Sequence, residues 1–429
     1  MRLLTIFTPL LILAFLPAST GSVSSLELFS ETLTVGRSPD ATYSNLQDAI
    51  EAAKDNALIM IESGTYSAVS NEFIDPMCGN CLDPATEVHA TTGFRIVGKS
   101  LTIVGSGMSE TELITNAGYG IYIENCPSVK ISLVGITGGI RDQDGSATDA
   151  AVVVRNSSVE ISDCRIYENE GDYSVTVAGI GGIMGREGAV LNIHDNIIEN
   201  NSWDGVALYR GATATIRDNY IAHGRGAAVG ITWDASADVI RNEINDYWKG
   251  IGSFGNTRVT AYNNFVHDLR GWGIIATGTS DMICRNNTVV RCGNVGIAGW
   301  SEEARMEIVN NIIADNGGVE QWVAPRVGIW MNCLEGNYKI GYNAICGNHD
   351  AAVAFGYVEF EDGTWGFSEI RDFEGVDGNI YLDPILLEDN SIDIDPSSPC
   401  LDAGDPETLN LDGSRSHIGA TGGSFAETM

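Results

Sequence analysis

The basic side chains in the middle of this acidic chain are the first candidates for chemistry. Lys249 directly precedes Gly250, and Asp204 directly precedes Gly205 two repeats earlier; Arg225 and Arg270 lie on the turns nearby. A lysine whose pKa is pulled towards neutrality can take a proton from carbon, while an arginine neutralises an adjacent carboxylate. If the protein abstracts a proton, Lys249 would be the base and Arg225 or Arg270 the neutralising group, while Asp204 and Lys249 would bracket one unit of substrate.

Aromatic side chains recur beside these groups and form a candidate binding surface. The candidates are Tyr209, Trp233, Phe254, Trp272 and Trp300. Period-two alternation along a strand places Tyr209, Phe254 and Trp300 on one outer face. Rings exposed along a groove can stack on sugar rings, so a polysaccharide is the expected partner. The alternative is that long loops cover these rings as a satellite core. We favour the groove, because large apolar groups left in water usually mark a contact site.

A regular repeat of asparagines indicates what must position these residues. The spacings between successive members are 23, 23, 22, 23 and 24 residues. The asparagines are Asn196, Asn219, Asn242, Asn264, Asn287 and Asn311. Short runs rich in Val, Ile and Thr, broken by Gly, Asn and Asp, follow each one, which predicts strands and turns rather than helices. A period this regular means stacked copies of one supersecondary unit.

About 23 residues allow three short strands and three turns, which is one coil of a right-handed parallel β-helix rising by roughly 4.8 Å. Each asparagine would then lie beneath its counterpart, and the amides would form a ladder of hydrogen bonds. A buried amide paired in this way avoids the cost of an unsatisfied polar group. The fold class is therefore all-β, a solenoid of about ten coils, and the asparagines are structural rather than catalytic.

An amphipathic helix at about 44–55 is predicted to cap the N-terminal end of the solenoid. Ser44-Asn-Leu-Gln47 has the form of a capping box, and Leu46, Ala49 and Ile50 fall on one helical face. The β-helix with this cap is predicted to span residues 28–345. An irregular segment, 346–429, would pack on its far end.

With its repeats and its Ile61-Glu-Ser-Gly-Thr-Tyr66 stretch, the chain resembles the pectate-lyase-like superfamily of secreted right-handed β-helix proteins with PbH1-type repeats. The resemblance implies the fold, whereas solenoids host unrelated functions. The leading functional expectation is an exported protein that engages polysaccharide through an outer-face groove, with a uronic-acid polysaccharide lyase or epimerase as its candidate activity. The superfamily's runs of calcium-ligating aspartates are absent beside Lys249. A glycoside hydrolase needs two carboxyls within about 10 Å, whereas Asp204 and Asp234 would lie about 23 Å apart. The remaining alternative is a non-enzymatic cell-surface or structural protein that binds glycan.

The N-terminal sequence predicts that the protein is exported. Residues 1–20 have a basic start, an apolar run and small residues, which predicts a signal peptide and a secreted or extracytoplasmic protein. No later stretch is long enough to span a membrane. A net charge of −33 disfavours nucleic acid and anionic membranes as partners. The oligomeric state stays open.

The nine cysteines of an exported chain can form disulfides, and an odd count leaves at least one thiol unpaired. Cys78 and Cys81 resemble a loop staple, and Cys164 occupies a ladder position. Cys333 and Cys346 are candidates for a clip on the last coil, and the connectivity stays open.

Aspartates near the C-terminus suggest calcium as a cofactor. Asp402, Asp405 and Asp412 supply hard oxygen ligands on turns. Asx-turn chemistry explains the same residues, and we favour this interpretation because Asp and Gly form turns far more often than ion sites.

Overall fold

The computed structural model describes residues 28–170, 179–319, 325–361, 363, 365–388 and 391–426. The predicted signal peptide lies outside these residues. Within them, no helix is long and apolar enough to cross a membrane.

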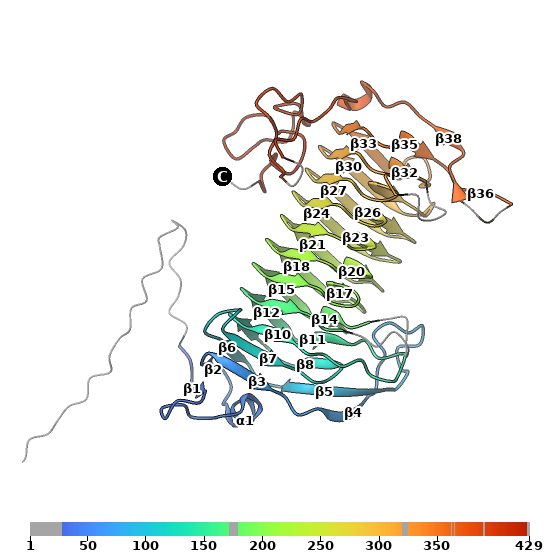
Figure 1. Cartoon of the computed structure of the whole chain (residues 1–429). Helices are drawn as coiled ribbons and strands as arrows, with labels where there is room; N and C mark the ends of the chain where they lie inside the picture. The colour runs from blue at the N-terminus through green and yellow to red at the C-terminus, as the bar shows by residue number, and fades with distance from the viewer. Residues whose placement is uncertain are drawn as a thin grey trace, which may run out of the picture.

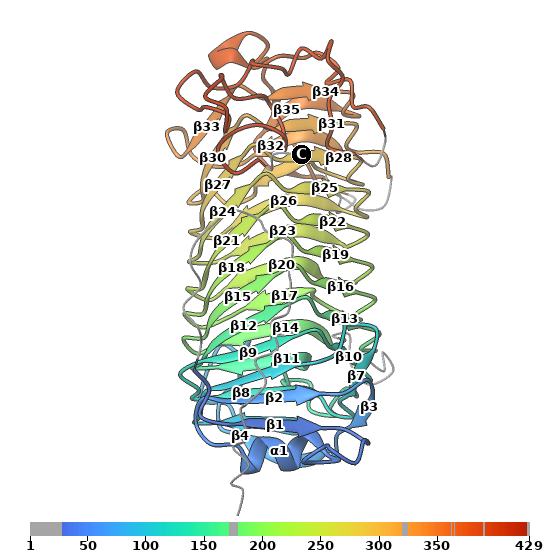
Figure 2. The ribbon, with the colours of Figure 1, turned by 90° about the vertical axis from the view of Figure 1, so that its left-hand side faces the viewer.

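The described chain winds into a solenoid whose strands form three long sheets, as Figures 1 and 2 show. Sheet A has 12 strands: β1 (Thr32–Val35), β2 (Ala57–Ile61), β6 (Leu101–Val104), β9 (Val129–Ser132), β12 (Ser158–Ser162), β15 (Val190–His194), β18 (Thr213–Arg217), β21 (Ser236–Ile240), β24 (Arg258–Tyr262), β27 (Asp281–Arg285), β30 (Arg305–Val309) and β33 (Tyr338–Gly341). Sheet B has 11 strands: β3 (Gly64–Ser67), β7 (Thr111–Ile114), β10 (Gly135–Thr137), β13 (Arg165–Tyr167), β16 (Ile197–Glu199), β19 (Tyr220–Ala222), β22 (Glu243–Asn245), β25 (Phe265–His267), β28 (Thr288–Val290), β31 (Ile312–Ala314) and β34 (Ala344–Cys346).

Sheet C carries the outer face on which the candidate residues were predicted. Its 13 strands are β4 (Asn71–Asp75), β5 (Val88–Val97), β8 (Tyr119–Glu124), β11 (Ala150–Arg155), β14 (Gly181–Arg186), β17 (Val206–Leu208), β20 (Ala227–Thr232), β23 (Lys249–Phe254), β26 (Trp272–Thr277), β29 (Ile297–Gly299), β32 (Val327–Met331), β35 (Ala351–Phe355) and β38 (Glu369–Ile370). Only β4 and β38, at the two edges of this sheet, pair antiparallel. A small hairpin, β36 (Val358–Glu359) and β37 (Trp365–Gly366), and the 3-10 turn η1 (Val376–Gly378) follow the last coils. The predicted all-β parallel β-helix is confirmed.

Helix α1 (Leu46–Ala52) closes the N-terminal end of the stack beneath the first coil, as Figure 2 shows. Its N-cap is Asn45, whose side chain accepts hydrogen bonds from the backbone N–H groups of Gln47 and Asp48. The predicted capping box was therefore wrong by one residue. The Gln47 side chain instead accepts from the backbone of Arg95 and so ties the helix to sheet C.

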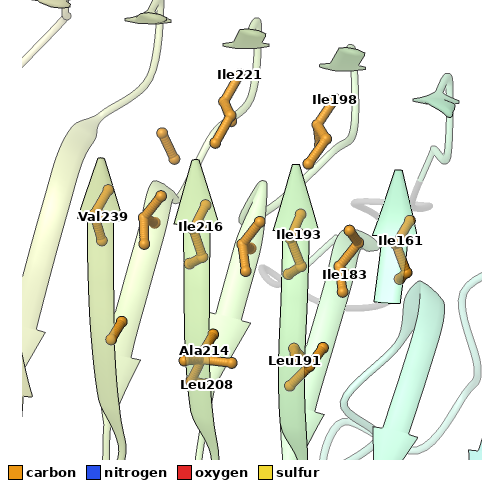
Figure 3. Packing of buried hydrophobic residues seen from close by; sticks show 14 of the residues in the cluster. Ile161, Ile183, Leu191, Ile193, Ile198, Leu208, Ala214, Ile216, Ile221 and Val239 are labelled. Carbon is orange, nitrogen blue, oxygen red and sulfur yellow. The ribbon is translucent and has the colours of Figure 1, made fainter. Parts of the chain in front are cut away.

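The interior is filled by inward-facing aliphatic side chains that stack from coil to coil. Figure 3 shows one such column on sheet A, where Ile161, Ile193, Ile216 and Val239 follow one another. Each is fully buried. Because the parallel register repeats, each side chain meets a similar one above and below, and the core is continuous along the solenoid.

The predicted asparagine ladder is present as a run of hydrogen bonds. At each step, the backbone N–H and the side-chain Nδ2 of one asparagine donate to Oδ1 of the next, as from Asn219 to Asn242 at 3.1 and 2.9 Å. The run continues past Asn311 to Asn343 and Asn379. At its start the backbone of Cys164 donates to Asn196, as its predicted ladder position requires. The stack thus reaches beyond residue 345, and sheet C continues to β35.

A second set of asparagines holds the end of the chain against the solenoid. Asn263, Asn286 and Asn310 precede ladder asparagines and have positive φ angles of 53° to 60°. Their side chains point outwards and bond to residues 400–426, which we call the C-terminal strap; Asn263 Nδ2, for example, donates to the carbonyl of Gly422 at 2.6 Å. The strap therefore packs along three successive turns.

Cys78 and Cys81 form a disulfide, as predicted. The predicted clip between Cys333 and Cys346 is wrong, because both thiols are free. The first of these cysteines is buried in the main core, whereas the second packs on a separate cluster beneath the strap.

Candidate active site

The outer face of sheet C is covered at both ends. At the N-terminal end lies the disulfide loop, residues 76–87 between β4 and β5, where Trp233 Nε1 donates to Asn80 Oδ1 at 2.9 Å. At the other end the chain after β35 crosses the sheet, and Trp330 Nε1 donates to the carbonyl of Gly356 at 2.8 Å. Figure 1 shows both coverings as projections on its right-hand side, the lower by β4 and β5 and the upper by β36.

Between the two coverings the outward side chains become small. Residues that pair across neighbouring strands form one row of outward-facing positions on this sheet. In chain order the row is Tyr122, Val153, Met184, Ala207, Gly230, Gly252, Ile275, Ala298 and Trp330. The atoms nearest to a Cβ atom built on Gly230 would be Ala227 Cβ at 3.5 Å and Asp204 Oδ2 at 3.6 Å, which are ordinary contacts. The sheet therefore has a low floor at its centre, with larger side chains towards both ends.

A pocket of about 270 Å³ lies on this floor. Five predicted site residues line it: Asp204, Tyr209, Arg225, Lys249 and Phe254. The other lining residues, which the sequence prediction missed, are Asn80, Trp203, Gly226, Ala227, Gly230, Thr232 and Trp248. The two tryptophans directly precede Asp204 and Lys249 in the chain, and this shared position was a sequence signal that could have identified them.

Asp204 is held in one orientation by the neighbouring coil. The backbone N–H of Ala227 donates to its Oδ1 at 2.7 Å. This bond requires a glycine at position 226, because a Cβ atom there would lie 2.0 Å from Oδ1. The second oxygen, Oδ2, faces the floor at Gly230. Burial raises the pKa of Asp204 to about 6, against the lowering effects of the Ala227 hydrogen bond and of Lys249. A carboxyl with this pKa can exchange a proton close to neutral pH.

Lys249 lies two strands away on the same row, so its backbone is about 10 Å from that of Asp204. Among the described residues, no carboxylate oxygen lies within 4.0 Å of its Nζ. Burial lowers its pKa, and the charge of Asp204 only partly opposes that effect. Nζ lies 6.0 Å from the ring centroid of Phe254. The ammonium group is thus partly desolvated, and desolvation favours the neutral amine that can act as a base.

The two arginines differ in position. Arg225 is exposed at the rim of the pocket. Arg270 is outside it: its guanidinium donates to the backbone carbonyls of Gly224 and Asp246 and lies 3.4 Å from the Asp246 carboxylate. The structure therefore does not bring Arg270 to Lys249, because this side chain is used to hold the turn.

The predicted aromatic groove is only partly present. The side chain of Trp233 bonds to the disulfide loop, and the Arg210 guanidinium lies 4.4 Å from its ring centroid. Tyr209 is buried beneath the same loop. For Trp272 and Trp300 the satellite-core alternative is the correct one. Both pack in a cluster with Trp330, Tyr357 and Trp365, where the Trp300 and Trp330 ring centroids lie 5.0 Å apart.

The three C-terminal aspartates do not form a metal centre. Among the described residues, no three or more His, Cys, Asp or Glu side chains come together in a way that could hold a metal ion. Asp405 accepts from the backbone of Glu407, and Asp412 accepts from Ser414, which are the turn interactions of the alternative explanation. Asp402 lies beside His417 instead. Calcium remains a prediction without residues assigned to it.

A family model described as the right-handed β-helix region matches residues 86–244 and 226–358. The chain belongs to the right-handed β-helix family. No curated protein sequence matches it. Similar solved structures include the A-module of the mannuronan C-5 epimerase AlgE6 of Azotobacter vinelandii, with 16% identity, 74% of this chain and 84% of that one covered, and a TM-score of 0.47. The pectate lyase Pel9A has 13% identity, with 92% and 96% covered and a TM-score of 0.46. A PL6 family polysaccharide lyase of Pseudopedobacter saltans has 13% identity, with 73% and 84% covered and a TM-score of 0.39. At these identities the likeness concerns the fold alone.

Proposed function

We propose that the pocket binds an acidic sugar unit of an extracellular polysaccharide and removes the proton next to its carboxylate, as a uronate lyase or a C-5 epimerase does. The observation that carries the proposal is Lys249, a partly buried lysine that faces a pocket with no carboxylate partner among the described residues. A structural lysine in so acidic a chain would be expected to pair with an acid. This one is kept available for a ligand.

In the proposed reaction, neutral Lys249 takes the C5 proton. In a lyase the C4–O bond then breaks, the electrons of the C–H bond form a C4–C5 double bond, and protonated Asp204 gives its proton to the leaving oxygen. In an epimerase, Asp204 returns a proton to C5 from the opposite face. Arg225 at the rim pairs with the substrate carboxylate and offsets the repulsion from the chain's overall negative charge. The proposed steps use only side chains that line the pocket.

The test measures both outcomes of proton removal. The protein is incubated in D₂O with pectate, alginate and glycosaminoglycans, with and without calcium. Ultraviolet absorbance detects unsaturated uronate, and mass spectrometry detects deuterium at C5. Removing a general base costs about 10²- to 10⁴-fold in rate, so Lys249→Ala is expected to lose at least about a hundredfold. Lys339→Ala, at an exposed lysine on β33, is the matched control and should keep full activity. Full activity in Lys249→Ala overturns the proposal.

The glycan-binding alternative predicts a different result from the same experiment. Neither absorbance nor deuterium would change on any substrate, while binding would persist. The partly exposed rings of Trp203, Trp248 and Phe254 around the pocket are the observation in its favour.

A further inference from the structure

Two groups of residues, which we call the first and second walls, close the pocket at its two ends along the solenoid axis. The first wall is the disulfide loop. The backbone carbonyl of Gly79 accepts from Arg210 Nε at 3.2 Å, and the carbonyl of Cys81 accepts from the same guanidinium. Arg186, which is fully buried and paired with Asp75, donates to the carbonyl of Met77 at 2.9 Å. The loop that presents Asn80 to the pocket is therefore fixed by its own disulfide and by two arginines of the solenoid.

The second wall is aromatic. The ring of Phe254 folds over Gly252, since a Cβ atom on that glycine would lie 2.4 Å from the ring. Behind it, Trp272 and Trp330 stack with their centroids 5.8 Å apart, and the chain after β35 covers them. Among the described residues, the floor of the pocket is lined by strands β17, β20 and β23 and the residues next to them, and these strands span about 10 Å at the usual strand spacing.

We infer that the site accepts the end of an acidic glycan chain, or a short acidic oligosaccharide, rather than an internal stretch of a long polymer; this inference rests on the proposed function. A volume of about 270 Å³ is at or below the lower limit of about 300 Å³ for small-molecule pockets. It has room for about one or two sugar rings, and a chain running along the axis meets a wall at each end. The rest of the chain leaves past the exposed rim at Arg225.

Product analysis tests this inference on a substrate that the protein turns over. Viscosity and unsaturated product are measured together on the polymer. Action at chain ends gives monosaccharide or disaccharide from the start, with viscosity nearly unchanged. An early collapse in viscosity, with products of mixed length, overturns the inference and leaves the proposed function intact.

Binding provides a test that does not depend on turnover. Calorimetry with the Lys249→Ala variant compares uronate oligosaccharides from the disaccharide to the octasaccharide. Affinity is expected to rise by less than about threefold beyond the disaccharide, and a continued rise with length overturns the inference. In a Cys78→Ser, Cys81→Ser double variant the first wall is loosened, so the affinity should rise with oligosaccharide length. Binding that is limited to short chains, without proton exchange in the wild type, supports the inference while the proposed function fails. No binding to any oligosaccharide overturns both.

Discussion

The ring of Tyr247 occupies the space beside Gly224 on the neighbouring coil, where a Cβ atom would lie 2.1 Å from the tyrosine Cε1. In coils nearer the two ends of the solenoid the same turn position holds asparagine, and Asn169 bonds to Asn201 and Asn316 to Asn348 as a second, shorter ladder. This second ladder is interrupted in the coils that carry Lys249. The tyrosine replaces hydrogen bonds by aromatic packing directly behind the pocket.

We expect Tyr247→Phe to be neutral or stabilising by about 1 kcal/mol. The phenol oxygen is buried and has no hydrogen-bond partner among the described residues, so removing it relieves an unsatisfied group. Gly224→Ala should instead destabilise by about 1–3 kcal/mol through overpacking. Urea denaturation measures both. A clear loss of stability in Tyr247→Phe would show that the hydroxyl is bonded.

Asn242→Ala should lower the free energy of unfolding by about 3 kcal/mol or more. Its Oδ1 accepts two hydrogen bonds from Asn219, and its Nδ2 donates to Asn264 and to the carbonyl of Ile216. Truncation leaves these buried groups without partners. Asn192→Ala, at a partly exposed position on β15, is the control and should change stability by less than about 0.5 kcal/mol. Similar losses for the two variants would contradict the ladder as a source of stability.

Asp204→Asn should stabilise the protein at alkaline pH. Because the folded pKa of Asp204 is raised from 3.8 to about 6, its contribution to stability is fully present below pH 4 and is lost as pH rises through 6. The asparagine avoids this loss and keeps an acceptor for Ala227. At pH 8 the free energy of unfolding of Asp204→Asn should exceed that of the wild type by at most about 3 kcal/mol. The difference is smaller than this limit because solvent screens the partly exposed carboxyl. Melting temperatures of both proteins at pH 4 and pH 8 measure it, and a variant that is less stable at pH 8 contradicts the prediction.

The proposed reaction predicts a bell-shaped dependence of kcat/KM on pH. Activity should fall below about pH 6, where Asp204 and Lys249 are both protonated. It should fall again above the lowered pKa of Lys249, where both are deprotonated. Residual activity of Asp204→Asn, in which Lys249 alone titrates, should lack the alkaline limb, and its acidic limb should move to the pKa of Lys249. An acidic limb that persists unchanged in this variant assigns it to another group.

Gly230→Leu should abolish ligand binding without unfolding the protein. A side chain at this position finds ordinary contacts and extends over the floor of the pocket beside Asp204. Gly145→Leu, on a loop where a Cβ atom meets nothing within 4 Å, is the matched control. Calorimetry with uronate oligosaccharides measures binding, and melting temperature checks folding. Unchanged affinity in Gly230→Leu would place the ligand elsewhere.

The asparagine spacing predicted the fold because a buried amide stack needs the same residue in every coil. The same register correctly placed Asp204 and Lys249 two coils apart in one row, and period-two alternation placed Phe254 on the outer face of that sheet. What covers that face was not predictable from the period. The paths of the disulfide loop and of the segment after β35 depend on contacts between distant residues, such as Asn80 with Trp233, 153 residues apart. Trp272 is therefore buried and Trp300 partly buried in a cluster that the period could not predict.

The C-terminal strap connects parts of the chain that the coils themselves keep apart. Strand pairing joins each coil to its neighbour, whereas the bond from Asn263 to Gly422 joins residues 159 positions apart. When the protein is pulled from its C-terminus, the strap must first come away from three successive turns. Only then can the coils beneath it unfold one at a time. Resistance to mechanical unravelling from that end is therefore set by a few turn asparagines on the surface, not by the aliphatic interior.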